Sequence, residues 1–371
     1  MASPPQPSRP LRAAVVGTGG ISHEHLSFLA GRTAIGDVAS RVELWAVADL
    51  SAASAAYAAK TFGARAAYTD LKELLEIEQP DVVHILTPPD THVRLATMCL
   101  EAGADVICEK PITPSYPDLV GLIGTADRCH RQIMESHNYR FNHAVEEMVA
   151  ATDRGELGEI REVTIRIALP VTDPDTRFGD PNLPSPIHAM PAGVIHDFTT
   201  HFAYLLLHLA PGVTYDRVAA AWSRHSGNQL FRYDDLDALL IGDGPDGPVH
   251  ARLRFDARSA PETFTIAVRG SKGMAETDIF QPYLRMVRPR TVGSRLSPVA
   301  NHLLNGASLF SSGVRNFGNK LMQRGPYEGL HHMLDLTYRA MASGTDLPVS
   351  HHDMLAASAL VDALLDQEAT R

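Results

Sequence analysis

An aspartate and a histidine four residues apart, Asp197 and His201, are the first candidates for proton chemistry. They fall in the stretch Gly193–Leu209, whose composition is helical and which ends before Pro211. Residues at i and i+4 share one face of a helix, so the carboxylate can orient the imidazole and stabilise its charged form. A histidine with a pKa near neutrality can remove the proton of a carbinol hydroxyl and return one to a carbonyl oxygen. The pair predicts acid–base catalysis, and a plain surface pair on a helix is the alternative.

A lysine follows a buried-strand pattern in the first half of the chain. Lys110 lies in the tripeptide Glu109-Lys110-Pro111, directly after the apolar run Asp105–Cys108. Doubly wound folds bind ligands at the carboxyl ends of their strands. The ammonium group of Lys110 can stabilise a developing alkoxide there. A solvated loop lysine is the alternative.

A glycine-rich turn follows the first apolar run, Leu11–Val16. In such a turn the first glycine bends the chain sharply and the second lets the backbone approach a pyrophosphate. The next helix then presents unpaired N–H groups and a positive dipole end to the anion. Ser22 stands at the third position, where the pattern expects glycine or alanine. The turn predicts a dinucleotide site, and a turn that only separates a strand from a helix is the alternative. The residues expected at this cofactor are Gly17, Thr18, Gly19, Gly20 and Ile21.

Asp49 ends the second apolar stretch, Val42–Asp49, where a ribose-binding carboxylate belongs. Its side chain would accept hydrogen bonds from the ribose hydroxyls and repel a 2′-phosphate, so NAD is favoured over NADP. The distance from the glycine turn exceeds the usual spacing of about 20 residues. We place the additional residues in a loop at Gly31–Ser40. The alternative is that Asp49 caps the following helix.

The first half alternates apolar strand patterns with helical ones, which predicts a parallel, doubly wound α/β sheet. The second half predicts strands joined by short turns, many of them alternating, as in a sheet with one covered face and one open face. An open sheet face is a common interface in symmetric homo-oligomers. Two helices are expected to close the chain. The second-half strands are predicted at Glu159–Val171, Arg217–Arg224, Asp235–Ile241, His250–Asp256, Thr263–Arg269 and Met274–Ile279, and the closing helices at Tyr327–Ala342 and His352–Gln367.

Composition narrows the class of protein. The 371 residues suggest two domains, and a net charge of −10 argues against nucleic acid as a partner. Three cysteines without paired spacing suit reduced thiols in the cytoplasm. No apolar run is long enough to span a membrane. Residues 1–10 are rich in proline and serine, which predicts a disordered tail rather than a signal peptide.

These motifs occur together in one order. The glycine turn, Asp49, the run Thr87–His92, Glu109-Lys110-Pro111, and Gly193-Val-Ile-His-Asp-Phe-Thr-Thr-His201 follow one another along the chain. This order resembles the glucose–fructose oxidoreductase/inositol dehydrogenase (Gfo/Idh/MocA) family over most of the chain.

The resemblance implies an N-terminal Rossmann domain at 11–137. It also implies an α+β domain at 138–371 with a large, mostly antiparallel sheet, whose helix at 351–368 packs back on the first domain. It further implies a nicotinamide cofactor, sugar-like substrates and homodimers or homotetramers. Lys110, Asp197 and His201 match the family's catalytic positions. Thr87, Pro88, His92, Glu109 and Lys110 are then expected at the cofactor, with capping of a helix as the alternative for His92.

Further substrate contacts are expected from the entry into the second domain and from the segment before the catalytic helix. That segment holds six prolines from Pro170 to Pro191, which predicts an irregular pocket loop. We expect no metal, because His196 and His201 point to different faces of their helix. A structural role is the alternative for each substrate candidate. The candidates are Asn138, Arg140, His188 and His196, with Arg177 as a further loop residue.

Residues 279–327 contain no aspartate or glutamate but carry seven arginines and lysines among leucines and phenylalanines. We interpret this segment as a binding site for an anionic part of the substrate, such as a nucleotide-sugar diphosphate, or for an acidic membrane surface. A basic amphipathic insertion that covers a neighbouring subunit is the alternative. The basic residues are Arg285, Arg288, Arg290, Arg295, Arg315, Lys320 and Arg324.

The leading hypothesis is an NAD(H)-dependent oxidoreductase that transfers hydride to or from a secondary alcohol of a sugar, cyclitol or nucleotide-sugar. The second is an enzyme that retains NAD and uses transient oxidation for elimination, epimerisation or glycoside cleavage. The third is a non-catalytic, NAD-responsive binding protein.

Overall fold

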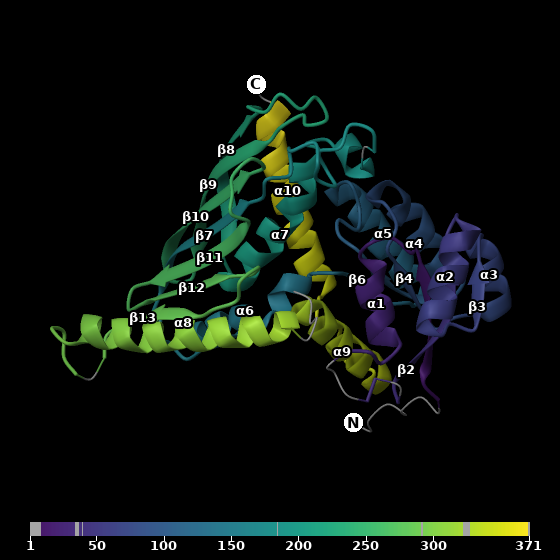
Figure 1. Cartoon of the computed structure of the whole chain (residues 1–371), viewed down its shortest axis with the longest axis horizontal. Helices are drawn as coiled ribbons and strands as arrows, with labels where there is room; N and C mark the ends of the chain where they lie inside the picture. Colours follow the sequence, from purple (N-terminus) through teal and green to yellow (C-terminus); the bar gives the residue numbers. More distant parts are fainter. Residues whose placement is uncertain are drawn as a thin grey trace. The chain divides into compact units, whose positions relative to one another are not determined.

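The chain forms two compact units in the computed structural model, which describes residues 9–33, 37–38, 40–183, 185–290, 292–321 and 327–369 (Figure 1). For residues 319–321 and 368–369 only the backbone is described. The first unit comprises Met1–Asn138 and Gly329–Ser358, and the second comprises Tyr139–Glu328 and Ala359–Arg371.

The first unit is built on a parallel six-stranded sheet in the order β3-β2-β1-β4-β5-β6. Strand β4 is buried throughout and β1 is buried from Ala13 to Val16, because helices follow the strands and cover both faces. The order reverses beside β1, and doubly wound sheets bind ligands at that switch point. The strands are β1 Leu11–Val16, β2 Val42–Ala48, β3 Ala66–Tyr68, β4 Val82–Ile85, β5 Asp105–Cys108 and β6 Ile133–Glu135; the helices are α1 Ser22–Leu29, α2 Ala52–Phe62, α3 Leu71–Glu78, η1 Pro89–Thr91, α4 His92–Glu101 and α5 Tyr116–Cys129.

Helix α9, Glu328–Ser343, belongs to the first unit apart from its first residue, which corrects the predicted boundary of the second domain. Its Tyr338 ring is fully buried and stacks on Phe28 of α1 at 6.1 Å between ring centroids. His331 of α9 also lies 3.2 Å from the Glu24 carboxylate of α1. Apolar and ionic contacts made far along the chain therefore complete the Rossmann unit.

The second unit is built on a seven-stranded sheet in the order β13-β12-β11-β7-β10-β9-β8. All neighbours are antiparallel except β7 and β10. Helix α7 packs against one face of this sheet, and α8 follows its β13 edge (Figure 1). Helix α10, His351–Ala369, contributes its later part, where the Leu364 carbonyl accepts a hydrogen bond from the Trp222 indole at 3.2 Å. The strands are β7 Ile160–Ala168, β8 Thr214–Ser223, β9 Asp235–Gly244, β10 Gly247–Asp256, β11 Thr263–Gly270, β12 Met274–Asp278 and β13 Arg285–Val287; the helices are η2 Asn138–Phe141, α6 His143–Asp153, η3 Pro186–Ala189, α7 Val194–Leu209 and α8 Ser297–Leu321.

The predicted fold class is confirmed, with local differences. Arg9 of the expected disordered tail forms an ion pair with Asp81 at 2.6 Å, whereas residues 1–8 lie outside the described residues. The proline-rich segment is not wholly irregular, because Pro186–Ala189 form a 3₁₀ turn. Arg324 and part of the Gly31–Ser40 loop also lie outside the described residues, as does the side chain of Lys320.

Candidate active site

The glycine turn after β1 is shaped by its contact with the end of β4. Gly17 has φ +89°, and a Cβ there would lie 2.8 Å from the Leu86 carbonyl oxygen. Only glycine combines this backbone conformation with so close an approach. A Cβ on Gly19 would meet no atom within 4 Å. The turn is therefore tight on the protein side and open where a pyrophosphate would approach.

Ser22 occupies the position of the third glycine, and its side chain makes a hydrogen bond there. It is the first residue of α1, it is buried, and its hydroxyl donates to the Gly19 carbonyl oxygen at 2.6 Å. Of the first-turn amides of α1, those of Ser22 and Glu24 donate to the Gly19 and Ile21 carbonyl oxygens, each at 3.1 Å. The Ser22 side chain thus stabilises the turn through the hydrogen bond of its hydroxyl.

The Asp49 carboxylate lies directly beside the turn. One oxygen accepts hydrogen bonds from the Thr18 amide and hydroxyl, both at 2.8 Å, and the other accepts from the Ser51 amide at 2.9 Å. Burial would raise the pKa of Asp49, but these hydrogen bonds from Ser51 and Thr18 outweigh it and lower the pKa. Helix α2 is capped by Ser51, whose hydroxyl accepts from the Ser54 amide. Asp49 is thus tied to the glycine turn, and the alternative that it caps α2 is wrong.

His92 connects two of the loops expected at the cofactor. Its imidazole is buried, with Nδ1 2.9 Å from the Pro111 carbonyl oxygen and Nε2 2.8 Å from the Thr87 carbonyl oxygen. The Thr87 hydroxyl also lies 2.6 Å from that of Thr91. These contacts hold the Thr87-Pro88 loop after β4 against the Lys110-Pro111 loop after β5. The ring serves the site by fixing these loops.

A buried chain of polar side chains, which the sequence analysis missed, begins at Glu109. Its Oε1 lies 3.4 Å from Nε2 of His25, whose Nδ1 lies 2.8 Å from Nδ1 of His84. Nε2 of His84 lies 2.7 Å from the Tyr338 hydroxyl. His25, His84 and Tyr338 are fully buried. No local pattern could have revealed the chain, because its members come from α1, β4, the end of β5 and α9.

The Glu109 carboxylate stays ionised although it is mostly buried. Burial would raise the pKa of Glu109, but the hydrogen bond and charge of His25, the charge of Lys110 and a hydrogen bond from Ser136 outweigh burial and lower it. A carboxylate is therefore kept ionised beside the Lys110 ammonium.

Helix α7 of the second unit carries Asp197 and His201 one turn apart, as predicted. The His201 ring is 4% exposed and lies among aromatic rings, with the Tyr139 ring centroid at 4.7 Å and the Phe198 centroid at 6.0 Å. Its Nδ1 lies 2.6 Å from the Tyr204 hydroxyl, which accepts a hydrogen bond from the Tyr139 amide at 3.3 Å. Tyr204 is a functional candidate that the sequence analysis missed, although its i+3 spacing from His201 was a usable signal.

The other predicted substrate residues lie in different settings. His188 turns inward, with Nε2 2.8 Å from the Phe178 carbonyl oxygen, and so closes the proline-rich loop. His196 is buried on α7, Asn138 is mostly buried, and Arg140 lies 5.9 Å from the Phe141 ring. Within the part of the chain that the structure describes, no three His, Cys, Asp or Glu side chains are grouped as metal ligands.

Residues 11–137 match the oxidoreductase family with an NAD-binding Rossmann fold. The chain is 30% identical over 291 residues to dTDP-3,4-didehydro-2,6-dideoxy-alpha-D-glucose 3-reductase of Streptomyces violaceoruber, covering 74% of this chain and 78% of that protein. It is 29% identical over 160 residues to D-glucoside 3-dehydrogenase of Escherichia coli, covering 43% of this chain and 44% of the relative. That match, like the one to inositol 2-dehydrogenase of Corynebacterium glutamicum, spans less than half of the relative's length.

The fold is also that of a solved structure, the WlbA dehydrogenase from Bordetella pertussis in complex with NADH and UDP-GlcNAcA. The TM-score is 0.75 at 18% identity, over 99% of this chain and 97% of that one. The glycine turn, the two sheets and the extended match to the Streptomyces reductase together show that this chain belongs to the Gfo/Idh/MocA family of oxidoreductases with an NAD-binding Rossmann fold.

Proposed function

We propose that the protein is an NAD(H)-dependent oxidoreductase that transfers hydride to or from a secondary alcohol carbon of a sugar, cyclitol or nucleotide-sugar. The observation that carries the proposal is the turn at Gly17, which is tight against β4 and open at Gly19, with Asp49 bound to Thr18. The names of the two relatives above refer to a deoxysugar nucleotide and to glucosides, which supports a sugar-like substrate for this protein.

The residues of the turn fit the cofactor. We propose that the amides of Gly19, Gly20 and Ile21 hold the pyrophosphate and that Asp49 holds the ribose hydroxyls. An ionised carboxylate at this point repels a 2′-phosphate, so NAD is preferred to NADP. When bound, the nicotinamide supplies the hydride acceptor or donor.

Lys110 is proposed to stabilise negative charge on the reacting oxygen. The ionised Glu109 lies beside it and places an opposite charge next to the ammonium group. A fixed ammonium stabilises a developing alkoxide without reorganising solvent. The contacts of His92 keep the backbone of this loop in place.

His201 is proposed to move the hydroxyl proton. The Tyr204 hydroxyl at Nδ1 can donate or accept, so it accommodates both neutral tautomers of the ring. Nε2 is then an acceptor when Nδ1 carries the proton and a donor when it does not. This property suits a group that acts as base in oxidation and as acid in reduction. Asp197 is proposed to favour the imidazolium form.

We further propose a reducing compartment, such as the cytoplasm, and a homo-oligomer. Cys99 and Cys108 are free, and burial raises the pKa of both thiols, that of Cys99 to about 12. The sheet face away from α7 offers a row of exposed or half-exposed side chains across neighbouring strands, Ala219, Leu239, Arg252, Thr164 and Ala267. Light scattering after size exclusion, on wild type and Leu239→Glu, tests that interface.

The activity is tested with a panel of sugars, cyclitols and nucleotide-sugars. Thermal shift with NAD(H) present selects ligands, and absorbance at the nicotinamide band then follows turnover. We expect stoichiometric change of NAD to NADH, or the reverse, with at least one ligand. Conversion of a ligand with NAD retained and no net change would favour the transient-oxidation enzyme. Binding of NADH without turnover of any ligand would contradict catalysis.

A further inference from the structure

Helix α8 lies with its polar side toward the protein. Apart from Ala300 and Gly318, its buried or half-buried residues with described side chains are serines and asparagines that repeat every three or four positions. Asn301 donates to the Arg288 carbonyl oxygen at 2.8 Å. Asn305 donates to the Met286 carbonyl oxygen at 2.9 Å and accepts from the Met286 amide at 3.1 Å. The inward residues are Ser297, Asn301, Asn305, Ser308, Ser312 and Asn316.

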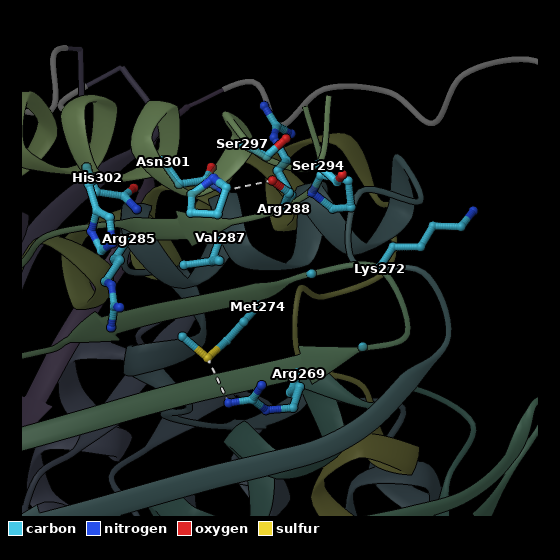
Figure 2. A pocket seen from close by; sticks show the side chains of 15 residues that line it. Arg269, Lys272, Met274, Arg285, Val287, Arg288, Ser294, Ser297, Asn301 and His302 are labelled. Atoms are coloured by element: carbon cyan, nitrogen blue, oxygen red, sulfur yellow. Dashed lines mark hydrogen bonds between the residues drawn. The ribbon is translucent and has the colours of Figure 1, made fainter. Parts of the chain in front are cut away.

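These contacts provide hydrogen-bond partners for the backbone groups at the free edge of the sheet. β13 is the last strand, so its outer amides and carbonyls have no neighbouring strand. Side-chain amides and hydroxyls of α8 pair with that edge and with the adjoining residues from Pro282 to Arg290. Figure 2 shows Ser297, Asn301 and His302 of α8 facing a cavity of about 490 Å³, with Val287 and Met274 on its strand side.

The apolar side of α8 consequently faces outward. Five large apolar residues have exposed fractions between 54% and 76%. Their spacing of four, seven, four and three residues places them on one stripe of the helix. The stripe runs about 27 Å at a rise of 1.5 Å per residue. Its members are Val299, Leu303, Phe310, Val314 and Phe317.

The stripe lies in a positively charged setting. Residues 279–327 contain no acidic residue, although the whole chain has a net charge of −10. Arg295 and Arg315 are exposed near the two ends of the stripe. The cavity beneath the helix adds the cationic side chain of Lys272, which Figure 2 shows at its rim, whereas Arg269 there lies 3.8 Å from the Glu162 carboxylate. Among the described helices, none combines the length and hydropathy that a transmembrane span requires.

We propose that α8 lies on an anionic lipid bilayer, with the apolar stripe in the acyl boundary and the arginines at the headgroups. An outward stripe of leucine, valine and phenylalanine with flanking cations is the pattern of an interfacial helix. Charge decides between a bilayer and a second copy. A symmetric copy docked through the same stripe would bring arginine-bearing segments without any acidic residue against each other, whereas an anionic leaflet complements them.

Vesicle flotation of the full-length protein tests the proposal. The probes are vesicles of phosphatidylcholine alone and of phosphatidylcholine mixed with an equal amount of phosphatidylglycerol. We expect flotation with the anionic vesicles, weakened by added salt, and little with the neutral ones. Replacing Leu303, Phe310 and Phe317 by glutamine should reduce binding at least about tenfold. These side chains point outward, so melting temperature should be unchanged.

Two further variants give the comparison its controls. Arg295→Gln with Arg315→Gln should weaken anionic binding while leaving the stripe intact. Tyr57→Gln, Ile77→Gln and Val120→Gln remove three exposed apolar residues from α2, α3 and α5 and should leave flotation unchanged. Failure of wild type to float with anionic vesicles would overturn the proposal, as would undiminished flotation of the stripe variant. Loss of an oligomer in the stripe variant, without vesicle binding by wild type, would assign the stripe to a second copy.

Discussion

The Nδ1 atoms of His25 and His84 lie 2.8 Å apart in the core of the Rossmann unit. One of the two must donate and the other accept. The ionised Glu109 can only accept, so Nε2 of His25 donates toward it. The pKa of His84 is held low, so its imidazole carries a single proton; it donates at one of its two contacts, with His25 or with the Tyr338 hydroxyl, and accepts at the other.

This arrangement predicts a pH-dependent stability. Burial and the neighbouring His25 hold the pKa of His84 well below its usual value of 6.5. The unfolded chain binds a proton near that value while the folded chain does not, so stability is present above it and falls as pH decreases. We expect a loss of up to about 1.4 kcal/mol per pH unit below about pH 6.5. Urea unfolding at a series of pH values measures it.

The control separates His84 from the protein's other histidines. His84→Gln should flatten that dependence by about one proton, whereas His250→Gln, on an exposed strand position, should leave it unchanged. Equal slopes in wild type and His84→Gln would contradict a neutral His84 in the folded protein.

The two glycines of the turn should respond oppositely to alanine. Gly17→Ala forces a Cβ against the Leu86 carbonyl oxygen at positive φ, so we expect a loss of at least about 1 kcal/mol of unfolding free energy. Gly19→Ala meets no protein atom, so stability should be unchanged while NAD affinity falls about tenfold or more. Denaturation and NADH fluorescence titration measure the two effects. Full NAD affinity in Gly19→Ala would show that the pyrophosphate does not bind at this turn.

Asp49 should determine the choice of dinucleotide. Asp49→Ala should raise the dissociation constant of NAD about 10- to 100-fold and that of NADP much less, because charged hydrogen bonds to the ribose are lost. Calorimetric titration with both dinucleotides checks this. Asp127→Ala removes an exposed carboxylate of α5 and serves as the control. An unchanged ratio of the two affinities would exclude Asp49 from the ribose site.

His201 and Tyr204 should separate in kinetics once a substrate is known. His201→Ala should lower kcat by about 10²- to 10⁴-fold. Tyr204→Phe removes the group at Nδ1 and should displace the pH–rate profile with a smaller loss of kcat and little change of KM. His208→Ala, two turns along α7, is the matched control. Near-normal kcat in His201→Ala would refute the proton-transfer role.

The sequence by itself determined the Rossmann unit and its cofactor turn. The signals there are local: an apolar strand, Gly17 and Gly19 at close spacing, and a carboxylate at the end of the next strand. Each depends on backbone geometry within a few residues, which residue types report directly. The helical spacing of Asp197 and His201 was readable for the same reason.

The tertiary structure decided which distant groups meet. Tyr338 reaches His84 across 254 positions, so no spacing along the chain could have predicted the contact. Helix α8 is the sharper case, because the apolar residues of an amphipathic helix are ordinarily expected to face the core. Here the neighbour is the edge of β13, whose unpaired backbone groups require hydrogen bonds, and the asparagines and serines turn inward to supply them. The sequence shows the apolar spacing of this helix. The direction in which the apolar stripe faces is decided by the strand edge against which the polar side of the helix packs.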